Sequence, residues 1–339
     1  MNILITGCAG FIGFHLTQSL LSKKNKVIGL DNINNYYDIK LKKDRLKLIL
    51  EYSKKNNFYF NFNKIDLSNY KKLKYIFKKN KIDIVINLAA QAGVRYSIDN
   101  PRKYLNSNIV GFFNIIELSR LNNVKQFIYA STGSVYGDNK KLPFDENYNT
   151  DKPLQFYAAT KKSNEVIAHS YSHLYKLKTI GLRFFTVYGP WGRPDMAYFK
   201  FTNLISKGKE INIFNNGNHV RDLTYISDVV NSIKKIILIS PRIFNHLEKK
   251  FKKNISIYTP FKIYNIGNGY PLKLIKLINY IEENLKIKSK KIFLSRQSGD
   301  AINTLCNKKN LNKDFNIKFK TDPKIGIKKF IKWYKKYYS

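Results

Sequence analysis

The chain has 339 residues, of which 43% are hydrophobic, and its formal net charge is +38 because 61 Lys and Arg outnumber 23 Asp and Glu. This composition excludes an intrinsically disordered chain, and the length suits one large α/β unit or two domains with a cleft between them. No apolar run reaches the roughly 18 residues of a membrane span, and no signal-peptide pattern opens the chain, so we expect a cytoplasmic protein without a membrane partner.

The positive charge raises nucleic-acid binding as an alternative. Lysine clusters such as residues 249–253 could neutralise phosphates. Lysine is, however, spread over almost every expected helix, and no recognition motif accompanies it. We therefore expect no specific nucleic-acid partner, with weak RNA binding left as a side effect. The two cysteines, Cys8 and Cys306, lack metal-site spacing, so we expect reduced thiols and no metal site.

Short apolar runs alternate with helical patterns through the first half of the chain. This alternation predicts an α/β fold with a Rossmann-type doubly wound parallel sheet, covered by helices on both faces. The expected strands are Ile3 to Ile5, Lys26 to Leu30, Phe58 to Ile65, Ile82 to Leu88, Phe127 to Ala130 and Thr179 to Arg183, and the expected helices begin near Phe14, Ile39, Tyr70, Pro101 and Tyr157.

The pattern becomes irregular after Gly189. We expect short strands near Ile211 and Ile263 and helices near Ser227, Pro271 and Pro323. Residues 1–188 are predicted to form a dinucleotide-binding domain, and residues 189–339 mainly a smaller C-terminal α/β domain that binds substrate. The helix near 227–239 is expected to return to the first domain. A ligand cleft should lie at the carboxyl edge of the sheet.

A glycine-rich loop, residues 6–13, lies between the first expected strand and the first expected helix. Its spacing is Gly-x-x-Gly-x-x-Gly. Glycines allow a tight turn and a close backbone approach, so amides at the helix start can bind a pyrophosphate. The loop residues expected to contact a cofactor are Gly7, Gly10, Phe11, Ile12 and Gly13.

Asp31 closes the second apolar run about 20 residues further on, where a carboxylate accepts both ribose hydroxyls and repels a 2′-phosphate. The preferred cofactor is therefore NAD, not NADP. Asn32 is expected beside the ribose, and Asp66 and Leu67, after the third strand, are placed to meet the adenine. For Asp66, a role as a helix N-cap is the alternative.

Tyr157 and Lys161 are four residues apart in an expected helix, so both side chains leave the same face. The lysine cation could hold the phenol partly ionised near neutral pH, which would make it a base for a sugar hydroxyl. Thr132 and Ser134 add hydroxyl groups after the fifth strand. Taken alone, this spacing also fits two surface residues.

With the glycine loop, these motifs make the chain resemble the extended short-chain dehydrogenase/reductase family over almost its whole length. The other matching segments are Asn87 to Ala90, Ser131 to Gly137, Arg221-Asp222 and Tyr264 to Asn268. The resemblance implies that Tyr157 is the acid/base, that Lys161 lowers its pKa and binds the nicotinamide ribose, and that Thr132 bonds to the reacting oxygen. Leu88, Ala89, Ala90 and Val187 are further cofactor candidates.

Ser134 narrows the expected reaction. Family members that dehydrate or decarboxylate nucleotide sugars carry an acidic residue at this place. A serine offers no obvious proton donor for a leaving hydroxyl, so dehydration is not expected. The remaining reaction removes a hydride and returns it, which is a 4-epimerisation.

The segment Arg183 to Ala197 resembles that of the epimerases acting on UDP-glucuronate. The resemblance implies that Thr186 and Arg193 meet the sugar carboxylate, since a guanidinium fork suits a carboxylate. Arg221, with the neighbourhood of residues 213–214, is expected to hold UDP. Further substrate candidates are Arg95, Ser134 and Asp300.

Several alternatives stay open at this point. Arg193 could instead form an inter-domain ion pair, and Arg95 could be a solvated loop charge. The substrate could be a neutral or N-acetylated UDP-hexose, the reaction could be a decarboxylation, or the chain could be an idle member of the fold that binds RNA. The resemblance also implies a homodimer formed through helices near residues 101–121 and 157–175.

Overall fold

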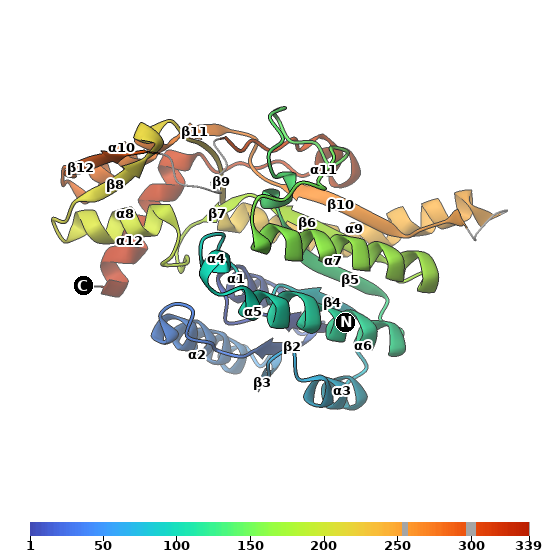
Figure 1. The fold of residues 1–339 in the computed structure, drawn as a ribbon. Coiled ribbons are helices and arrows are strands. Elements are labelled where there is room, and N and C mark those ends of the chain that lie inside the picture. The colour runs from blue at the N-terminus through green and yellow to red at the C-terminus, as the bar shows by residue number, and fades with distance from the viewer. Residues whose placement is uncertain (253–256, 296–302, 339) are drawn as a thin grey trace.

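The computed structural model describes residues 1–252, 257–295 and 303–338. Its centre is a parallel seven-stranded sheet with strand order β10-β6-β5-β4-β1-β2-β3 (Figure 1). This confirms the predicted doubly wound α/β fold. The strands are β1 (Asn2–Thr6), β2 (Lys26–Asp31), β3 (Tyr59–Lys64), β4 (Ile84–Asn87), β5 (Gln126–Thr132), β6 (Thr179–Phe184) and β10 (Phe261–Ile266).

The central strands are apolar on both sides because helices cover both faces of the sheet. In β1, Ile3 and Ile5 contribute to one buried cluster, and Leu4 contributes to the other. The first cluster lies under α1 (Phe11–Leu20) and α9 (Ile226–Lys250), which pack against each other. The second lies under α3 (Tyr70–Lys79), α6 (Gly111–Leu121) and α7 (Phe156–Tyr175).

The helix expected from Pro101 is interrupted. It consists of α5 (Pro101–Tyr104), the π-helical turn η1 (Leu105–Val110) and α6, and it follows the short α4 (Tyr96–Asp99). A π-helical turn shifts the helix register by one residue and often marks a functional site. Here it turns the side chain of Asn108 into the protein interior.

Most of the remaining elements form a smaller layer at the upper left of Figure 1, but α2 (Ile39–Lys55) packs on α1 and β3, and α11 (Lys309–Phe315) packs on α9 and β10. Pro271, near which a helix was expected, lies in a strand that pairs antiparallel with β9, and the helix starts at Leu274. A proline fits this place because it is the first residue of a short edge strand. The elements are β7 (Thr186–Tyr188), β9 (Val220–Tyr225) and β11 (Pro271–Lys273) in one sheet, β8 (Ile211–Phe214) and β12 (Lys291–Leu294) in another, the helices α2 (Ile39–Lys55), α8 (Ala197–Ser206), α10 (Leu274–Leu285), α11 (Lys309–Phe315) and α12 (Pro323–Tyr338), and the short turns η2 (Gly133–Tyr136) and η3 (Asn215–Gly217).

The second half of the chain returns twice to the central sheet. Helix α9 packs on α1, and β10 pairs with β6 at the sheet edge. The two parts of the chain are therefore not separate in the fold. That residues 1–188 bind the cofactor and residues 189–339 mainly bind substrate stays a prediction. No helix in the described parts of the chain combines the length and the apolarity that crossing a membrane requires.

Candidate active site

A pocket of about 1030 Å³ lies between the carboxyl edge of the sheet and the smaller layer. Asp300 falls outside the described residues. All the other residues predicted for the site line this one pocket, although they come from segments spread over most of the chain. They are Gly7, Gly10, Phe11, Ile12, Gly13, Asp31, Asn32, Asp66, Leu67, Leu88, Ala89, Ala90, Arg95, Thr132, Ser134, Tyr157, Lys161, Thr186, Val187, Arg193 and Arg221.

The glycine loop can hold a dinucleotide because its backbone passes too close to other chain segments for a side chain. Gly7 has a φ of +70°, and a Cβ there would lie 2.8 Å from the amide nitrogen of Ala89. A Cβ on Gly13 would lie 2.0 Å from the Gly7 carbonyl oxygen. No side chain caps the first turn of α1 at Gly10, so this helix start fits a pyrophosphate.

Asp31 lies at the end of β2, on the pocket wall. Its carboxylate accepts hydrogen bonds from the amides of Ala9 (3.1 Å) and Ile33 (2.8 Å). Burial raises the Asp31 pKa above its usual value, opposed by the Ile33 amide, Lys42, the Ala9 amide and Arg45. The carboxylate is thus placed as a ribose ligand requires.

Lys42 is a pocket residue that the sequence reasoning missed. Its ammonium donates to the backbone and side-chain oxygens of Asn34 at 2.7 and 2.6 Å. Burial lowers the Lys42 pKa to about 8, although the charge of Asp31 opposes this. The sequence signal was helical spacing. Lys42 is next to Leu41 and seven residues before Ile49, and all three are buried on the inward face of α2.

Asp66 does not cap a helix. The cap of α3 is Asn69, whose side chain accepts from the Lys72 amide at 3.0 Å. Asp66 instead accepts from the Asn32 side chain at 2.7 Å and from Ser68. Burial would raise the Asp66 pKa, but these hydrogen bonds outweigh it and hold the pKa below its usual value. An ionised Asp66 therefore lies beside Asn32 at the pocket edge.

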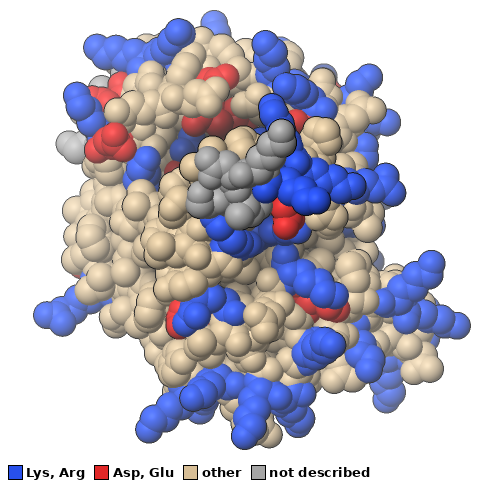
Figure 2. Space-filling model, turned by 90° about the vertical axis from the view of Figure 1, so that its right-hand side faces the viewer, with Lys and Arg blue, Asp and Glu red and all other residues tan. Residues whose placement is uncertain are grey.

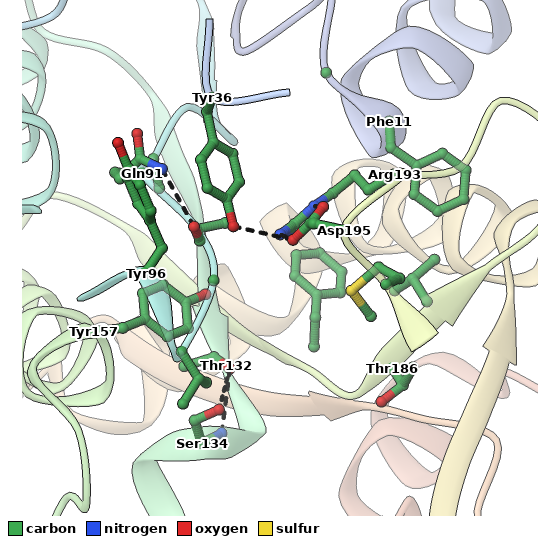
Figure 3. Close-up of a pocket in the computed structure, with 18 of the residues that line it drawn as sticks. Phe11, Tyr36, Gln91, Tyr96, Thr132, Ser134, Tyr157, Thr186, Arg193 and Asp195 are labelled. Atoms are coloured by element: carbon green, nitrogen blue, oxygen red, sulfur yellow. Dashed lines mark hydrogen bonds and ion pairs between the residues drawn. The ribbon is translucent and has the colours of Figure 1, made fainter. Parts of the chain in front are cut away.

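Tyr157, Thr132 and Ser134 lie on one side of the pocket (Figure 3). Tyr157 belongs to the first turn of α7, and Thr132 ends β5. The Thr132 hydroxyl accepts from the Ser134 amide at 3.2 Å, and the two hydroxyl oxygens are 3.3 Å apart. These hydroxyl groups together form what we call the catalytic wall.

The protein alone does not lower the Tyr157 pKa. Burial raises it, while the charge of Arg193 and a hydrogen bond with Thr132 oppose the rise. Lys161 is 2% exposed, and burial lowers its pKa to about 8 despite the nearby Glu165. Both pKa shifts work against the partly ionised phenol that the spacing predicted. Helix spacing does not show how deeply a side chain is buried.

Asn108, in the π-helical turn, was also missed. Its side-chain oxygen accepts from the Gln91 amide at 2.8 Å, and its amide group donates to the Gln91 carbonyl and the Thr160 hydroxyl, both at 3.0 Å. Asn164 donates to the Asn108 carbonyl at 2.6 Å. Asn108 thus joins the Gln91 segment of the pocket to the turn of α7 between Tyr157 and Lys161.

Behind the catalytic wall is a buried group that we call the core ion pair, Glu165 with Arg183. Both side chains are 3% exposed, and their closest atoms are 2.8 Å apart. The Ser131 hydroxyl donates to Glu165 at 2.6 Å. The core ion pair thus ties α7 to β6, and the Ser131 hydrogen bond ties α7 to the end of β5, next to Thr132.

On the opposite side, Arg193 and Asp195 form an ion pair that faces the pocket (Figure 3). The Arg193 Nε donates to Asp195 at 3.0 Å, and the Tyr36 hydroxyl donates to the same carboxylate at 3.1 Å. We call these three residues the sugar-facing wall. The partner of Arg193 lies in its own loop, so the ion pair is not the inter-domain pair that was the alternative. Thr186 lies apart from Arg193 in Figure 3.

Two further arginines, Arg95 and Arg221, line the pocket. The exposed Arg95 guanidinium lies 5.1 Å from the ring centre of Phe214, at the end of β8. Arg221 donates to its neighbour's carbonyl at Val220, at 3.1 Å. Of the expected pair 213–214, Phe214 lines the pocket, and Ile213 is buried in the core.

Asp222 organises this part of the pocket from inside the protein. It is fully buried and accepts from the amides of Asn268 (2.9 Å), Gly269 (2.8 Å) and Cys306 (3.0 Å). Burial raises its pKa to about 6, against those three amides. In the Arg221-Asp222 motif, Arg221 thus lines the pocket, while Asp222 fixes the loops at residues 268–269 and 306.

In the described parts of the chain, no group of three or more His, Cys, Asp or Glu side chains is arranged to hold a metal ion. Cys8 and Cys306 are both buried free thiols.

Comparison with known proteins gives a consistent result. The family model described as the NAD dependent epimerase/dehydratase family matches residues 3–245. Protein CapI of Staphylococcus aureus is 49% identical over 339 residues, covering 100% of both chains. UDP-glucuronate 4-epimerase 4 of Arabidopsis thaliana is 42% identical over 344 residues, covering 100% of this chain and 76% of the relative.

A solved structure is similar over the full length. The UDP-glucuronic acid 4-epimerase from Bacillus cereus, crystallised in complex with UDP-glucuronic acid and NAD, superimposes with a TM-score of 0.86. It is 29% identical, and the match covers 100% of both chains.

Proposed function

Because the chain belongs to the NAD-dependent epimerase/dehydratase family, we propose that it interconverts UDP-glucuronate and UDP-galacturonate by inverting C4 of the sugar. The observation that carries this proposal is the catalytic wall, where Tyr157 and Thr132 are accompanied by the hydroxyl of Ser134 and not by a carboxylic acid. Such a wall suits proton exchange at a hydroxyl and offers no acid for a leaving group.

NAD is the cofactor, and the glycine loop and Asp31 suit its pyrophosphate and ribose. When bound, NAD supplies a reversible hydride acceptor for C4 of the sugar. Lys42 and the Asn32–Asp66 pair extend the polar lining at the adenosine end.

Tyr157 takes the proton of the 4-hydroxyl, and the Thr132 hydroxyl orients the reacting oxygen. The product of this half-reaction is a 4-keto sugar that stays attached to UDP. Tyr157 acts in its phenolate form, and the charge of Lys161, buried one turn further along α7, favours that form before the 4-hydroxyl proton is transferred. The same residues act in reverse when C4 is reduced on its other face.

A uronic acid oxidised at C4 is a β-keto acid, which loses carbon dioxide when the carboxyl bond stands perpendicular to the ketone. The epimerase must therefore hold the carboxylate away from that geometry. The hydroxyls of Thr132, Ser134 and Thr186 are the candidates, with Arg193 nearby. Arg193 also has to satisfy Asp195, so its contact with a substrate carboxylate is shared with that ion pair.

The uridine diphosphate supplies binding energy that is independent of the sugar orientation. Arg221, Phe214 and Arg95 line the pocket. If they hold UDP while the sugar ring turns, C4 can present either face to the cofactor.

One experiment tests the proposal directly. Purified protein is incubated with UDP-glucuronate without added NAD, and the products are followed by NMR. We expect UDP-galacturonate and no UDP-pentose. No conversion after NAD is also supplied would contradict the proposal, and conversion of UDP-glucose instead would favour a neutral-hexose epimerase. UDP-pentose as the main product would favour a decarboxylase.

We propose no specific nucleic-acid partner. Lys and Arg side chains are spread over the face shown in Figure 2 and do not gather in one band. Retention of RNA that survives at high ionic strength would argue against this, because binding to a diffuse basic surface is strongly salt-dependent.

We also propose that the partner of the chain is a second copy. Helices α6 and α7 lie side by side and expose large apolar side chains. Phe113 is 47% exposed, Val166 58% and Leu174 63%. Exposed apolar groups on adjacent helices favour a helix-to-helix interface. Sedimentation of the wild type and of Val166→Glu tests this, with a dimer expected for the wild type and a monomer for the variant.

We propose a cytoplasmic location, with which the buried free thiols agree.

A further inference from the structure

Arg45, on α2, is a buried cation that the proposed reaction does not use. Its side chain is fully buried, and among the described residues it has no salt-bridge partner. Its guanidinium instead donates to oxygens from separate chain segments. Nη1 donates to the Ala9 carbonyl (3.1 Å) and the Tyr37 hydroxyl (2.7 Å), and Nη2 donates to the carbonyls of Trp191 (2.6 Å) and Gly192 (3.0 Å). Removing a cation from water is costly, so these four bonds must offset its desolvation.

Trp191 is strained in the segment that Arg45 holds. Its φ is +60°, in the left-handed region that a bulky side chain rarely adopts. Its ring packs against Phe14 on α1 (5.6 Å between centres) and against Trp333 and Tyr337 on α12 (5.3 and 4.9 Å). Such a backbone persists only where the surroundings fix it, and Arg45 binds the carbonyl of this residue.

The carbonyl of Pro190, the residue before Trp191, is also held by a hydrogen bond. His15, on α1, lies with its Nε2 2.9 Å from the Pro190 carbonyl oxygen. A carbonyl only accepts, so Nε2 carries the proton. Burial lowers the His15 pKa to about 4, despite this carbonyl, so the ring is neutral at pH 7. Three successive carbonyls, of residues 190–192, are thus held by His15 and Arg45 from the two helices that flank β2.

The held segment leads directly into the sugar-facing wall. Arg193 and Asp195 follow Gly192, and Asp195 accepts from Tyr36. At the other end of its contacts, Arg45 binds Ala9, whose amide donates to Asp31. One planar guanidinium therefore joins the cofactor loop to the segment that faces the sugar, a geometry that an ammonium group lacks.

We propose that Arg45 is a positioning residue that fixes residues 190–192 against the glycine loop and so sets the placement of Arg193 and Asp195 toward the acidic end of the substrate. The identity of that substrate rests on the proposed function. The claim about the loop does not, because it follows from contacts within the chain.

The test uses a reporter inside the held segment. The chain has 2 tryptophans, so Trp333→Phe leaves Trp191 as the single emitter and retains an aromatic ring on α12. In this background we compare Arg45→Met with Lys47→Met, a matched loss of a cation from a 74% exposed side chain on the same helix. Quenching of Trp191 by acrylamide should rise about twofold in Arg45→Met, because the segment opens more often, and should stay unchanged in Lys47→Met.

Kinetics supply the second readout. The KM for UDP-glucuronate should rise roughly 10- to 100-fold in Arg45→Met, with a smaller change in kcat, because bonds from a charged donor are lost on the sugar side. Affinity for UDP alone, by calorimetry, should stay within about twofold, since UDP does not reach the sugar-facing wall. The protein should also retain less NAD after gel filtration than Lys47→Met.

The outcomes separate the two proposals. If the wild type does not convert UDP-glucuronate, the proposed function fails, and the quenching comparison decides the role of Arg45 alone. The inference would be overturned if Arg45→Met and Lys47→Met showed the same acrylamide quenching and the same KM for UDP-glucuronate. If Arg45→Met does not fold, Arg45→Lys is used, and wild-type quenching and KM in that variant would overturn it equally.

Discussion

The two sides of the pocket are each built around an arginine–carboxylate pair, but water reaches only one of them. Behind the catalytic wall, Arg183 and Glu165 are each 3% exposed. In the sugar-facing wall, Arg193 and Asp195 are 24% and 23% exposed. A fully buried pair cannot exchange partners, whereas a pair at the pocket surface can share its charges with an arriving anion.

This difference suggests a division of work. The catalytic wall is held rigidly because Glu165 ties α7 to Arg183 on β6 and to Ser131 on β5, where substrate cannot reach. The sugar-facing wall is held from outside the pocket by Arg45, through the carbonyls of residues 191 and 192, and leaves its charges available. Substitutions in the first region should therefore change catalysis or stability, and substitutions in the second should change substrate choice.

The largest effect is expected at the catalytic wall. Tyr157→Phe should lower kcat by about 10³-fold, because the proton acceptor is lost, and should leave the free energy of unfolding almost unchanged. Turnover of UDP-glucuronate and urea unfolding measure the two quantities. Tyr171→Phe is the control, because Tyr171 is on the same helix as Tyr157 and its hydroxyl bonds to Glu117 on α6. Full activity in Tyr157→Phe would rule out the assigned base.

The core ion pair should matter for stability. Arg183→Met should lower the free energy of unfolding by about 3–5 kcal/mol, because it leaves the Glu165 charge buried without its partner. The double variant Glu165→Met/Arg183→Met should lose less than the sum of the single losses. Urea unfolding measures both. If Arg183→Met costs no more than the exposed Lys47→Met, the contrast between the two pairs is wrong.

Lys161 should show a stability cost paired with a catalytic role. In NAD-free protein, Lys161→Met should raise the free energy of unfolding at pH 7 by about 3 kcal/mol, because burial destabilises a lysine cation whose folded-state pKa is about 8. With NAD supplied, the same variant should be inactive. Below pH 8 the gain is complete. Between pH 8 and 10.5 it shrinks, since the folded wild type loses its proton before the unfolded chain does. Unfolding curves across this range check the sign, and a gain that grows with pH would contradict it.

The smallest effect on stability is expected at the sugar-facing wall. Arg193→Gln should raise the KM for UDP-glucuronate by about tenfold and change that for UDP-glucose much less, because only the first substrate carries a carboxylate. Its free energy of unfolding should fall by about 1 kcal/mol at most, since the pair is partly solvated. Parallel kinetics with both substrates test this, and equal changes in both KM values would place the carboxylate elsewhere.

Local sequence was enough to predict much of the fold and the catalytic wall. Apolar runs alternating with helical patterns predicted the parallel sheet, and the four-residue spacing of Tyr157 and Lys161 predicted one shared helix face, which lies at the pocket in the structure. The glycine spacing and Asp31 indicated the cofactor in the same way. Each of these patterns lies within one or two adjacent elements, where helix and strand periods fix the geometry.

Other parts of the site depend on burial of polar residues, which the sequence does not reveal. Arg45 bonds to residues 36 positions before it and 147 after it, and Asn108 to Thr160, 52 positions away. Arg45 is the single arginine of α2, but neither composition nor helix spacing shows that its guanidinium bonds to the carbonyls of residues 191 and 192. The rise that burial causes in the Tyr157 pKa of the protein alone could not be predicted for the same reason.

The sequence by itself thus determined the fold class and indicated the cofactor loop, because these follow from short-range periodicity and from residue chemistry. The roles of Tyr157, Lys161 and Thr132 are implied by the family resemblance and stay predictions. Only the tertiary structure decided which charges are paired. It assigned Arg183 to Glu165, Arg193 to Asp195, and Arg45 to backbone carbonyls. Those choices depend on which groups lose contact with water when distant segments pack together, and desolvation is a property of the folded chain.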